Sequence, residues 1–164
     1  HYIETGRSFF EVKLKVGNGR THKRRLETPA FATRCSPALV SALDSREAPL
    51  ASAPLAPALT NEFSRITLVG RREPERVTLD LDLRFQAAGR AAALPGLVVA
   101  EVKQAGRPRQ SAFARQMRAA HLHPASFSKY CIGAALLYPD LKHNHFKPAL
   151  RQVSQLLKGA AHVD

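Results

Sequence analysis

Charged and aliphatic residues alternate at a period of two in at least four segments of this chain, and this pattern constrains the fold more than any other feature. The segments are residues 11–16, 65–69, 76–83 and 98–103. Such alternation is typical of a β-strand with one solvated face, and a single strand of this kind would be ordinary. Because the pattern recurs, we predict a closed or strongly curved sheet that gathers basic faces around a lumen, with helices over its aliphatic outside.

The charged faces of these segments carry mostly Lys and Arg with a few carboxylates. Two segments share a Glu-x-Lys string, at Glu11 and at Glu101. A lumen lined by cations repels itself when empty, so it suits a polyanion, and a remaining carboxylate suits a divalent cation. In the third segment the alternation places Arg76, Thr78, Asp80 and Asp82 on the face opposite Val77, Leu79, Leu81 and Leu83.

The length of 164 residues predicts one domain that buries a single core without disulfides. The formal net charge of +12 indicates an anionic partner: nucleic acid, a phosphate-rich small molecule, polyphosphate or an acidic membrane surface. Charge alone does not choose among these partners. Cys35 and Cys131 lack metal-type spacing and predict two buried, reduced thiols in a cytoplasmic protein. No segment is long and apolar enough to span a bilayer, and the N-terminus has no secretory signal.

The order of the expected elements is strands first and helices last, which indicates an α+β fold with a mostly antiparallel sheet. Gly17-Asn18-Gly19 predicts a tight turn between the first two strands. The remaining predictions are strands at residues 8–16, 20–26, 60–69, 75–83 (with a possible continuation through 87) and 97–104, a loop at 89–96, and helices at 36–43, from 111, at 126–137 and at 146–157.

Several common functional motifs are absent from the sequence: a P-loop, a Gly-rich dinucleotide turn, a Gly-x-Ser-x-Gly elbow and a zinc-type Cys/His cluster. The His pairs at 121/123 and 143/145 do not have the context of a metal site. Basic runs at 71–72 and 23–25 could bind nucleic acid, but the chain has no Trp and few aromatic residues among its bases. We therefore do not expect nucleic acid as the partner.

The string Phe127-Ser128-Lys129-Tyr130 follows Pro124, where a helix is expected to begin. A helix N-terminus with a hydroxyl and a lysine nearby is a natural phosphate site. Ser and Lys are also common at helix starts that bind nothing, so the string alone does not establish a site.

Together with the strands, this string resembles the VTC (vacuolar transporter chaperone) domain, in its bacterial branch. The resemblance covers nearly the whole chain and rests on five strings in the family's order, at residues 9–15, 18–25, 76–80, 100–103 and 127–130. It implies the triphosphate tunnel fold, an antiparallel β-barrel with a charged lumen, as a single domain over 1–164 with tunnel strands in 1–109 and helices in 110–164. It also implies polyphosphate polymerase chemistry, in which the γ-phosphate of ATP is transferred to a growing chain with a divalent metal, manganese or magnesium.

The resemblance also implies roles for individual residues. Lys129 would be catalytic, Ser128 would close on the triphosphate with it, and Glu101 would ligate the metal. The residues that would bind phosphates in the tunnel are Lys13, Lys23, Arg25, Arg65, Arg76 and Lys103. These residue types suit the chemistry, because phosphoryl transfer needs neutralised charge and an in-line geometry more than a protein nucleophile.

Two departures from the family pattern bear on these expectations. The family has further tunnel strands ahead of the point where this chain starts, including an Arg-x-Arg strand, so we expect an N-terminally truncated domain with an incomplete tunnel. The eukaryotic pattern also has a basic residue where this chain has Ser126. The sequence therefore leaves open whether the chain is an enzyme. The alternatives are a triphosphate or tripolyphosphate hydrolase of the same fold and a non-catalytic polyphosphate-binding module, with a membrane protein as a conceivable partner and an undefined oligomeric state.

Overall fold

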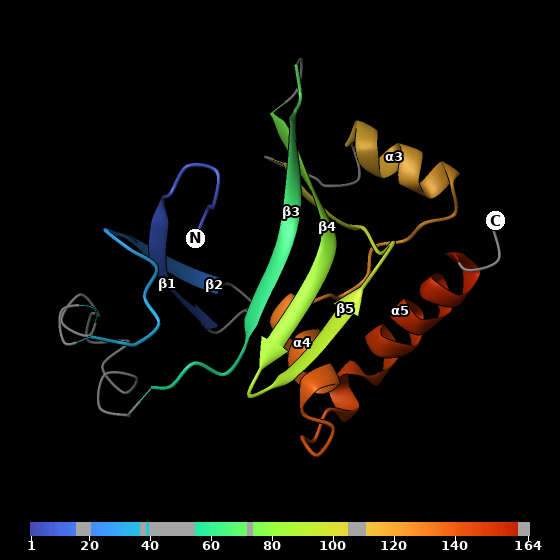
Figure 1. Ribbon diagram of the computed structural model, residues 1–164. Helices are drawn as coiled ribbons and strands as arrows, with labels where there is room; N and C mark the ends of the chain where they lie inside the picture. The colour runs from blue at the N-terminus through green and yellow to red at the C-terminus, as the bar shows by residue number, and fades with distance from the viewer. Residues whose placement is uncertain (16–20, 37–38, 40–54, 72–73, 105–110, 161–164) are drawn as a thin grey trace. The chain divides into compact units, whose positions relative to one another are not determined.

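The computed structural model describes residues 1–15, 21–36, 39, 55–71, 74–104 and 111–160, and it is shown in Figure 1. The chain divides into two compact units, His1–Pro57 and Ala58–Asp164.

The first unit is built on an antiparallel pair, β1 (Ser8–Lys15) and β2 (Thr21–Thr28). Their register runs from Ser8 opposite Thr28 to Lys15 opposite Thr21. The predicted strand pair is therefore confirmed. The predicted Gly-Asn-Gly turn and almost all of the helix predicted at 36–43 lie outside the described residues.

The second unit contains a four-stranded antiparallel sheet centred on β4 (Glu75–Ala87). One side of β4 pairs with β3 (Thr60–Val69) along nearly its whole length. The other side pairs with β6 (Val99–Gln104) through residues 75–80 and with β5 (Arg90–Leu94) through residues 83–87. The predicted strands at 60–69 and 75–83, the continuation through 87 and most of the strand at 97–104 are confirmed.

The loop predicted at 89–96 is wrong, because residues 90–94 form β5. Ala88 and Gly89 both have positive φ, 47° and 77°, and connect Ala87 to its partner Arg90. Two central residues of positive φ are typical of a hairpin turn whose twist matches its strands. This hairpin was not predicted from the sequence because alanine, here Ala88, rarely adopts the left-handed conformation.

A β-bulge in the middle of β4 changes the side to which its residues point. The register shifts between Glu62 and Ser64 of β3, and Asp82 at the bulge has a φ of 54°. Bulges insert one extra residue and so invert the alternation that follows. As a result, the face of β4 that carries Thr78 and Asp80 continues with buried Leu83, not with Asp82, which is exposed. The predicted placement of Asp82 and Leu83 is therefore wrong.

Three helices follow the strands, as predicted: α3 (Ala112–Ala119), α4 (Lys129–Leu137) and α5 (Lys147–Ala160), the last preceded by the short 3₁₀ helix η3 (Asn144–Phe146). α4 begins three residues later than predicted, because Ser128 and not Ser126 is its N-cap. α5 likewise begins at Lys147 and ends at Ala160, against a prediction of 146–157. No helix among the described residues is long and apolar enough to cross a membrane.

The core of the second unit lies between one face of the sheet and the helices α4 and α5. Its buried members are Leu83, Phe85, Leu94, Leu97, Ile132, Leu137 and Val153. Gly133 lets α4 approach the sheet closely, since a Cβ there would lie 2.9 Å from the Cε1 atom of Phe85 and nearer still to its Cδ1 atom. α4 therefore packs closely against β4 at Gly133.

The α+β class and the antiparallel pairing are confirmed, but the described residues form no closed barrel, and the incomplete tunnel stays a prediction. Among the described residues the strands form two separate sheets, of two and four strands. Cys35 and Cys131 are both free, as predicted, although each is only partly buried.

Candidate functional site

Most of the predicted site residues of the second unit come from one face of its sheet. Arg65 of β3 lies opposite Asp80 of β4, and Arg76 of β4 lies opposite Lys103 of β6. Glu101 of β6 lies opposite Thr78. Residues opposite each other in an antiparallel pair point to the same face. We call this face, with the start of α4, the sheet site.

The bulge places the sheet site and the hydrophobic core on the same face of the sheet. Asn61 lies opposite Phe85, and Arg65 lies opposite Asp80. Residues 61 and 65 are four apart on one strand and therefore share a face. The carboxylate of Asp80 thus lies on the same face as buried Phe85, against which α4 packs.

Asp80 is the centre of the sheet site. Its side chain is 1% exposed, and its Oδ1 and Oδ2 atoms accept hydrogen bonds from Nε and Nη2 of Arg65 at 2.6 and 2.8 Å. The Nζ atom of Lys129 lies 2.5 Å from Oδ2. A bidentate arginine and a lysine on one buried carboxylate form a strong, geometrically defined group. The structure thereby brings together two predicted site residues that lie far apart in the sequence.

The ring of Phe63 also contacts these two cations. The Nζ atom of Lys129 lies 4.8 Å from the ring centroid, and the guanidinium carbon of Arg65 lies 5.1 Å from it. Cations within about 6 Å of an aromatic ring are attracted by its quadrupole. Phe63 therefore supports the same arrangement as Asp80.

The charge of Asp80 is maintained by its partners. Burial raises the pKa of Asp80, but the hydrogen bonds from Arg65 and Lys129 outweigh burial and hold the pKa below its usual value. Asp80 is therefore ionised at neutral pH, as a buried carboxylate can be only when it is paired and hydrogen-bonded.

The start of α4 supplies Lys129 and Ser128. The Oγ atom of Ser128 accepts a hydrogen bond from the backbone N–H of Cys131 at 3.3 Å, which makes Ser128 the N-cap. Lys129 is then the first helical residue, so its backbone lies at the positive end of the helix dipole. A helix N-terminus therefore lies at Ser128 and Lys129, three residues beyond the predicted start, and its lysine points to Asp80.

Glu101, the predicted metal ligand, pairs with Lys103 at the more open end of the sheet site. The distance between Lys103 Nζ and Glu101 Oε1 is 3.2 Å, and both side chains are about half exposed. Thr78, opposite Glu101, is 6% exposed, and its Oγ1 atom has no hydrogen-bond partner among the described residues. The described residues contain no group of three or more His, Cys, Asp or Glu side chains placed to hold a metal ion.

The other three predicted phosphate-binding residues lie in the first unit, around Glu11. The carboxylate of Glu11 pairs with Lys13 at 3.1 Å, with Lys23 at 2.6 Å and with Arg25 at 3.0 Å. We call this group the hairpin cluster. Arg25 also lies over the ring of Phe9, 4.7 Å from its centroid.

The hairpin cluster strongly lowers the pKa of its carboxylate. Partial burial raises the pKa of Glu11, but hydrogen bonds from Lys23, Lys13 and Arg25 together lower it to about 2. The three cations are 43–63% exposed in their side chains, so they remain open to a solution partner.

Sequence reasoning did not identify Asp80, Thr78 or Glu11 as site residues. Asp80 and Glu11 were visible as sparse carboxylates on basic strand faces and inside two of the five family strings. That each would collect cations from neighbouring segments depends on strand register, which the alternation does not specify. Whether the hairpin cluster and the sheet site face one lumen stays a prediction.

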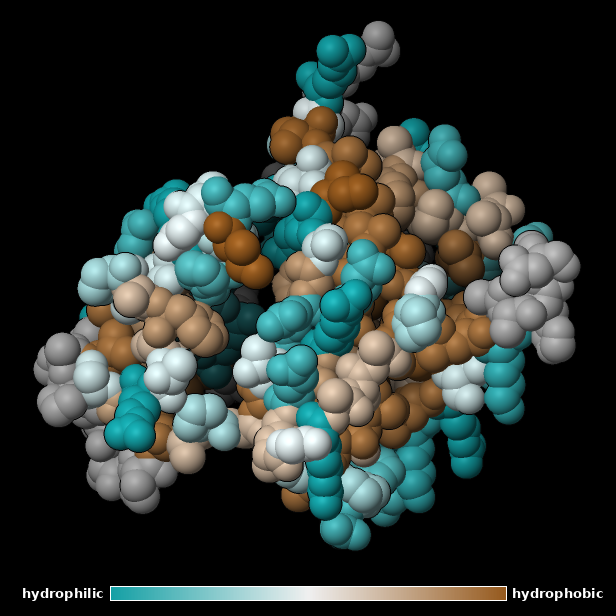
Figure 2. Space-filling view, viewed as in Figure 1, coloured by the Kyte–Doolittle hydropathy of each residue, from teal (hydrophilic) through white to brown (hydrophobic). Residues whose placement is uncertain are grey.

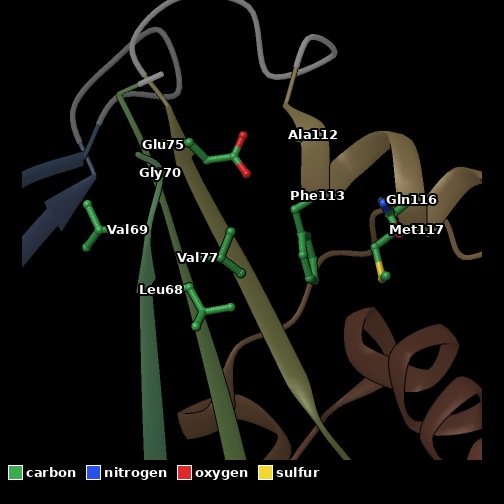
Figure 3. A pocket seen from close by; sticks show the side chains of 9 residues that line it. All are labelled: Leu68, Val69, Gly70, Glu75, Val77, Ala112, Phe113, Gln116 and Met117. Atoms are coloured by element: carbon green, nitrogen blue, oxygen red, sulfur yellow. The ribbon is translucent and has the colours of Figure 1, made fainter. Parts of the chain in front are cut away.

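A pocket of about 350 Å³ lies at the opposite side of the sheet, between α3 and the adjoining ends of β3 and β4. Figure 3 shows Phe113 and Met117 of α3 facing the strands that carry Leu68 and Val77. Glu75 is its one charged lining residue among those described. The hydrophobic surface near the upper end of β3 in Figure 2 agrees with this lining. Such an apolar, weakly acidic pocket does not suit a polyanion.

Comparison with known families decides the relationship of the chain. The model of the VTC domain matches residues 2–138, which include both the hairpin cluster and the sheet site. The chain belongs to the VTC domain family. No curated protein and no solved structure gave a significant match. Membership in the VTC family indicates a function related to polyphosphate and confirms the resemblance inferred from the five strings.

Proposed function

We propose that this VTC domain is a polyphosphate polymerase, which transfers the γ-phosphate of ATP to a growing polyphosphate chain with a divalent metal ion. The observation that carries the proposal is the sheet site. Four cations lie on one sheet face or at the adjoining helix start, and two carboxylates, Asp80 and Glu101, pair with three of them: the cations are Arg65, Arg76, Lys103 and Lys129. An excess of fixed positive charge on a rigid sheet suits a chain of phosphates.

The roles of the cations in this proposal follow from their chemistry. Arg76 can hold two phosphate oxygens, Arg65 adds its positive charge beside Asp80, and Lys103 acts as a point charge. Lys129, with Ser128 at the start of α4, binds the transferred phosphoryl group and neutralises the charge that develops on it. In the first unit, Lys13, Lys23 and Arg25 bind further phosphates.

The residues at the open end of the sheet site fit the metal ion that the family implies. Mg²⁺ is usually held by one or two carboxylates together with substrate phosphates and water. Glu101 is exposed enough to supply one carboxylate, and the unpartnered hydroxyl of Thr78 lies on the adjacent strand. A bound metal would neutralise phosphate charge there.

A second candidate function is a non-catalytic polyphosphate-binding module. It is favoured by the hairpin cluster, in which three exposed cations surround one carboxylate. Such a cluster can bind a polyanion by charge alone. A hydrolase of triphosphate or tripolyphosphate would use the same residues as the polymerase.

Incubation of the protein with ATP and Mn²⁺ tests these functions, with long-chain polyphosphate and free phosphate measured separately. The polymerase proposal expects long-chain polyphosphate in the presence of metal only. Free phosphate without polymer would indicate the hydrolase instead. If neither product forms while polyphosphate binds with a steep dependence on salt concentration, the chain is a binding module.

A further inference from the structure

We propose that Asp80 is a positioning residue for polyphosphate binding: it holds the side chains of Arg65 and Lys129 in the geometry that receives phosphate. The inference rests on the proposed function and concerns a carboxylate that does not itself touch the substrate. It assigns a favourable role to a negative charge in the middle of an anion-binding site.

The contacts of Asp80 engage particular donors of its two cations. Arg65 gives Nε and Nη2 to the carboxylate. The ammonium of Lys129 has three N–H donors, so Lys129 keeps donors for phosphate oxygens beside its contact with Asp80. Oδ1 and Oδ2 of Asp80 bind Nε and Nη2 of Arg65, and this pair of bonds fixes the plane of the guanidinium. Oδ2 also contacts Nζ of Lys129 and so fixes the position of the ammonium.

The surroundings of Asp80 make this positioning rigid. Asp80 is 1% exposed and lies on a central strand, while its partners come from β3 and from the first turn of α4. Phe63 contacts both cations from the side. Ordering long side chains before binding reduces the entropy lost when a ligand immobilises them. Without Asp80, the long side chain of Lys129 would sample several rotamers.

The substitution Asp80→Asn separates positioning from simple charge, because the two effects have opposite signs. Removing a negative charge raises the net positive charge of the site. If Asp80 contributed only its charge, the Asp80→Asn protein would therefore bind tripolyphosphate more tightly than the unchanged protein. If Asp80 positions the cations, Asp80→Asn weakens tripolyphosphate binding by about tenfold, the size expected for charge-assisted hydrogen bonds. Tighter or unchanged binding by a folded Asp80→Asn protein would overturn the proposal.

Glu11→Gln is the matched control. It removes the same charge from the exposed hairpin cluster, where no comparable positioning is expected, and should tighten tripolyphosphate binding by up to about fivefold. A loss of affinity in Glu11→Gln similar to that in Asp80→Asn would mean that both variants act through general destabilisation, and would also overturn the proposal.

A double-mutant cycle identifies the residue through which Asp80 acts. In a Lys129→Met background, Asp80→Asn should reduce tripolyphosphate affinity by clearly less than in the unchanged protein, because only Arg65 is left for Asp80 to position. An undiminished loss in that background would show that Asp80 does not act through Lys129.

A measurement on the unchanged protein covers the case in which Asp80→Asn fails to fold. The ¹⁵N NMR signal of the Lys129 ammonium should be resolved and slow to exchange in the free protein, unlike the signals of exposed Lys13 and Lys103, and should shift on addition of tripolyphosphate. A Lys129 signal averaged like those of the exposed lysines would overturn the proposal. These binding and NMR measurements do not depend on turnover. A protein that makes no polymer would contradict the proposed polymerase function, while the positioning role of Asp80 would still be decided by the binding and NMR results.

Discussion

The hairpin cluster and the sheet site solve the same problem, a carboxylate among cations, in two different ways. Glu11 has three partners from the two strands of one hairpin, all with well-exposed side chains. Asp80 has two partners, from another strand and from a helix start, and is buried. Exposed ion pairs contribute little and are screened by salt, whereas a buried pair cannot lose one member without a large cost. Glu11 therefore mainly changes the net charge of the hairpin surface, whereas Asp80 contributes both to the stability of the fold and to the arrangement of the site.

The largest contrast is expected in stability. Asp80→Ala should lower the free energy of unfolding by about 3 kcal/mol or more, because it leaves two partly buried cations without their carboxylate. Glu11→Ala should cost less than about 1 kcal/mol, because its cations can turn to water. Urea unfolding of both variants checks this difference. Equal costs would mean that the two clusters are energetically alike.

Catalysis should divide the two clusters in the same way. Lys129→Ala should reduce polyphosphate synthesis from ATP by about 100-fold or more, the usual effect of removing a preorganised charge from a reacting group. Lys13→Ala should reduce it by only about threefold to fivefold, since Lys23 and Arg25 remain beside it. Initial rates with Mn²⁺ measure both effects. A Lys129→Ala protein that retains normal turnover would remove Lys129 from the catalytic role.

The contact between α4 and β4 should matter for the sheet site alone. Gly133→Ala places a Cβ against the ring of Phe85, and overpacking of this kind costs about 1–3 kcal/mol. The helix must shift, so the Lys129–Asp80 pair should weaken while the hairpin cluster is unchanged. Thermal unfolding and the NMR signals of Lys129 and Glu11 report these outcomes. Gly159→Ala in α5 is the control: nothing lies within 4 Å of the added Cβ, and helix propensity predicts a gain of up to about 1 kcal/mol.

Acid titration should show the smallest effect. The pKa of Glu11 is lowered from 4.5 to about 2, so its ionised form stabilises the folded state fully above pH 4.5, and this contribution is lost as the pH falls toward 2. Carboxyl NMR shifts should therefore titrate with a midpoint near 2. Lys23→Ala should raise that midpoint, because it removes the shortest ion pair of the cluster. A midpoint near 4.5 in the unchanged protein would contradict the cluster geometry.

Local patterns predicted the elements well wherever the sequence carried a local signal. The strand at 60–69 was predicted to the residue because alternation and its boundaries agree there. β5 was missed because Ala88 adopts a turn conformation that alanine rarely takes, and alanines do not distinguish strand from loop. The predicted start of α4 was three residues too early because Ser126 and Ser128 could each cap a helix. Only Ser128 accepts a hydrogen bond from the helix backbone.

The site residues could be named in advance through the family strings, but their partners could not. Arg65, Arg76, Glu101 and Lys103 were predicted on charged faces, and the register places them on one face of one sheet. The importance of Asp80 was not foreseen, nor was the position of Asp82, because a bulge reverses the alternation without leaving a mark in the hydrophobic pattern.

Charge, periodicity and composition are properties of short segments, so the amino-acid order was enough to establish a basic α+β protein with antiparallel strands and the family to which it belongs. The contact of Lys129 with Asp80 required folding, because it joins segments that meet only when α4 packs on β4 through Gly133 and Phe85. Burial makes the contact between Lys129 and Asp80 costly to break, because a buried carboxylate without its cationic partners is strongly unfavourable.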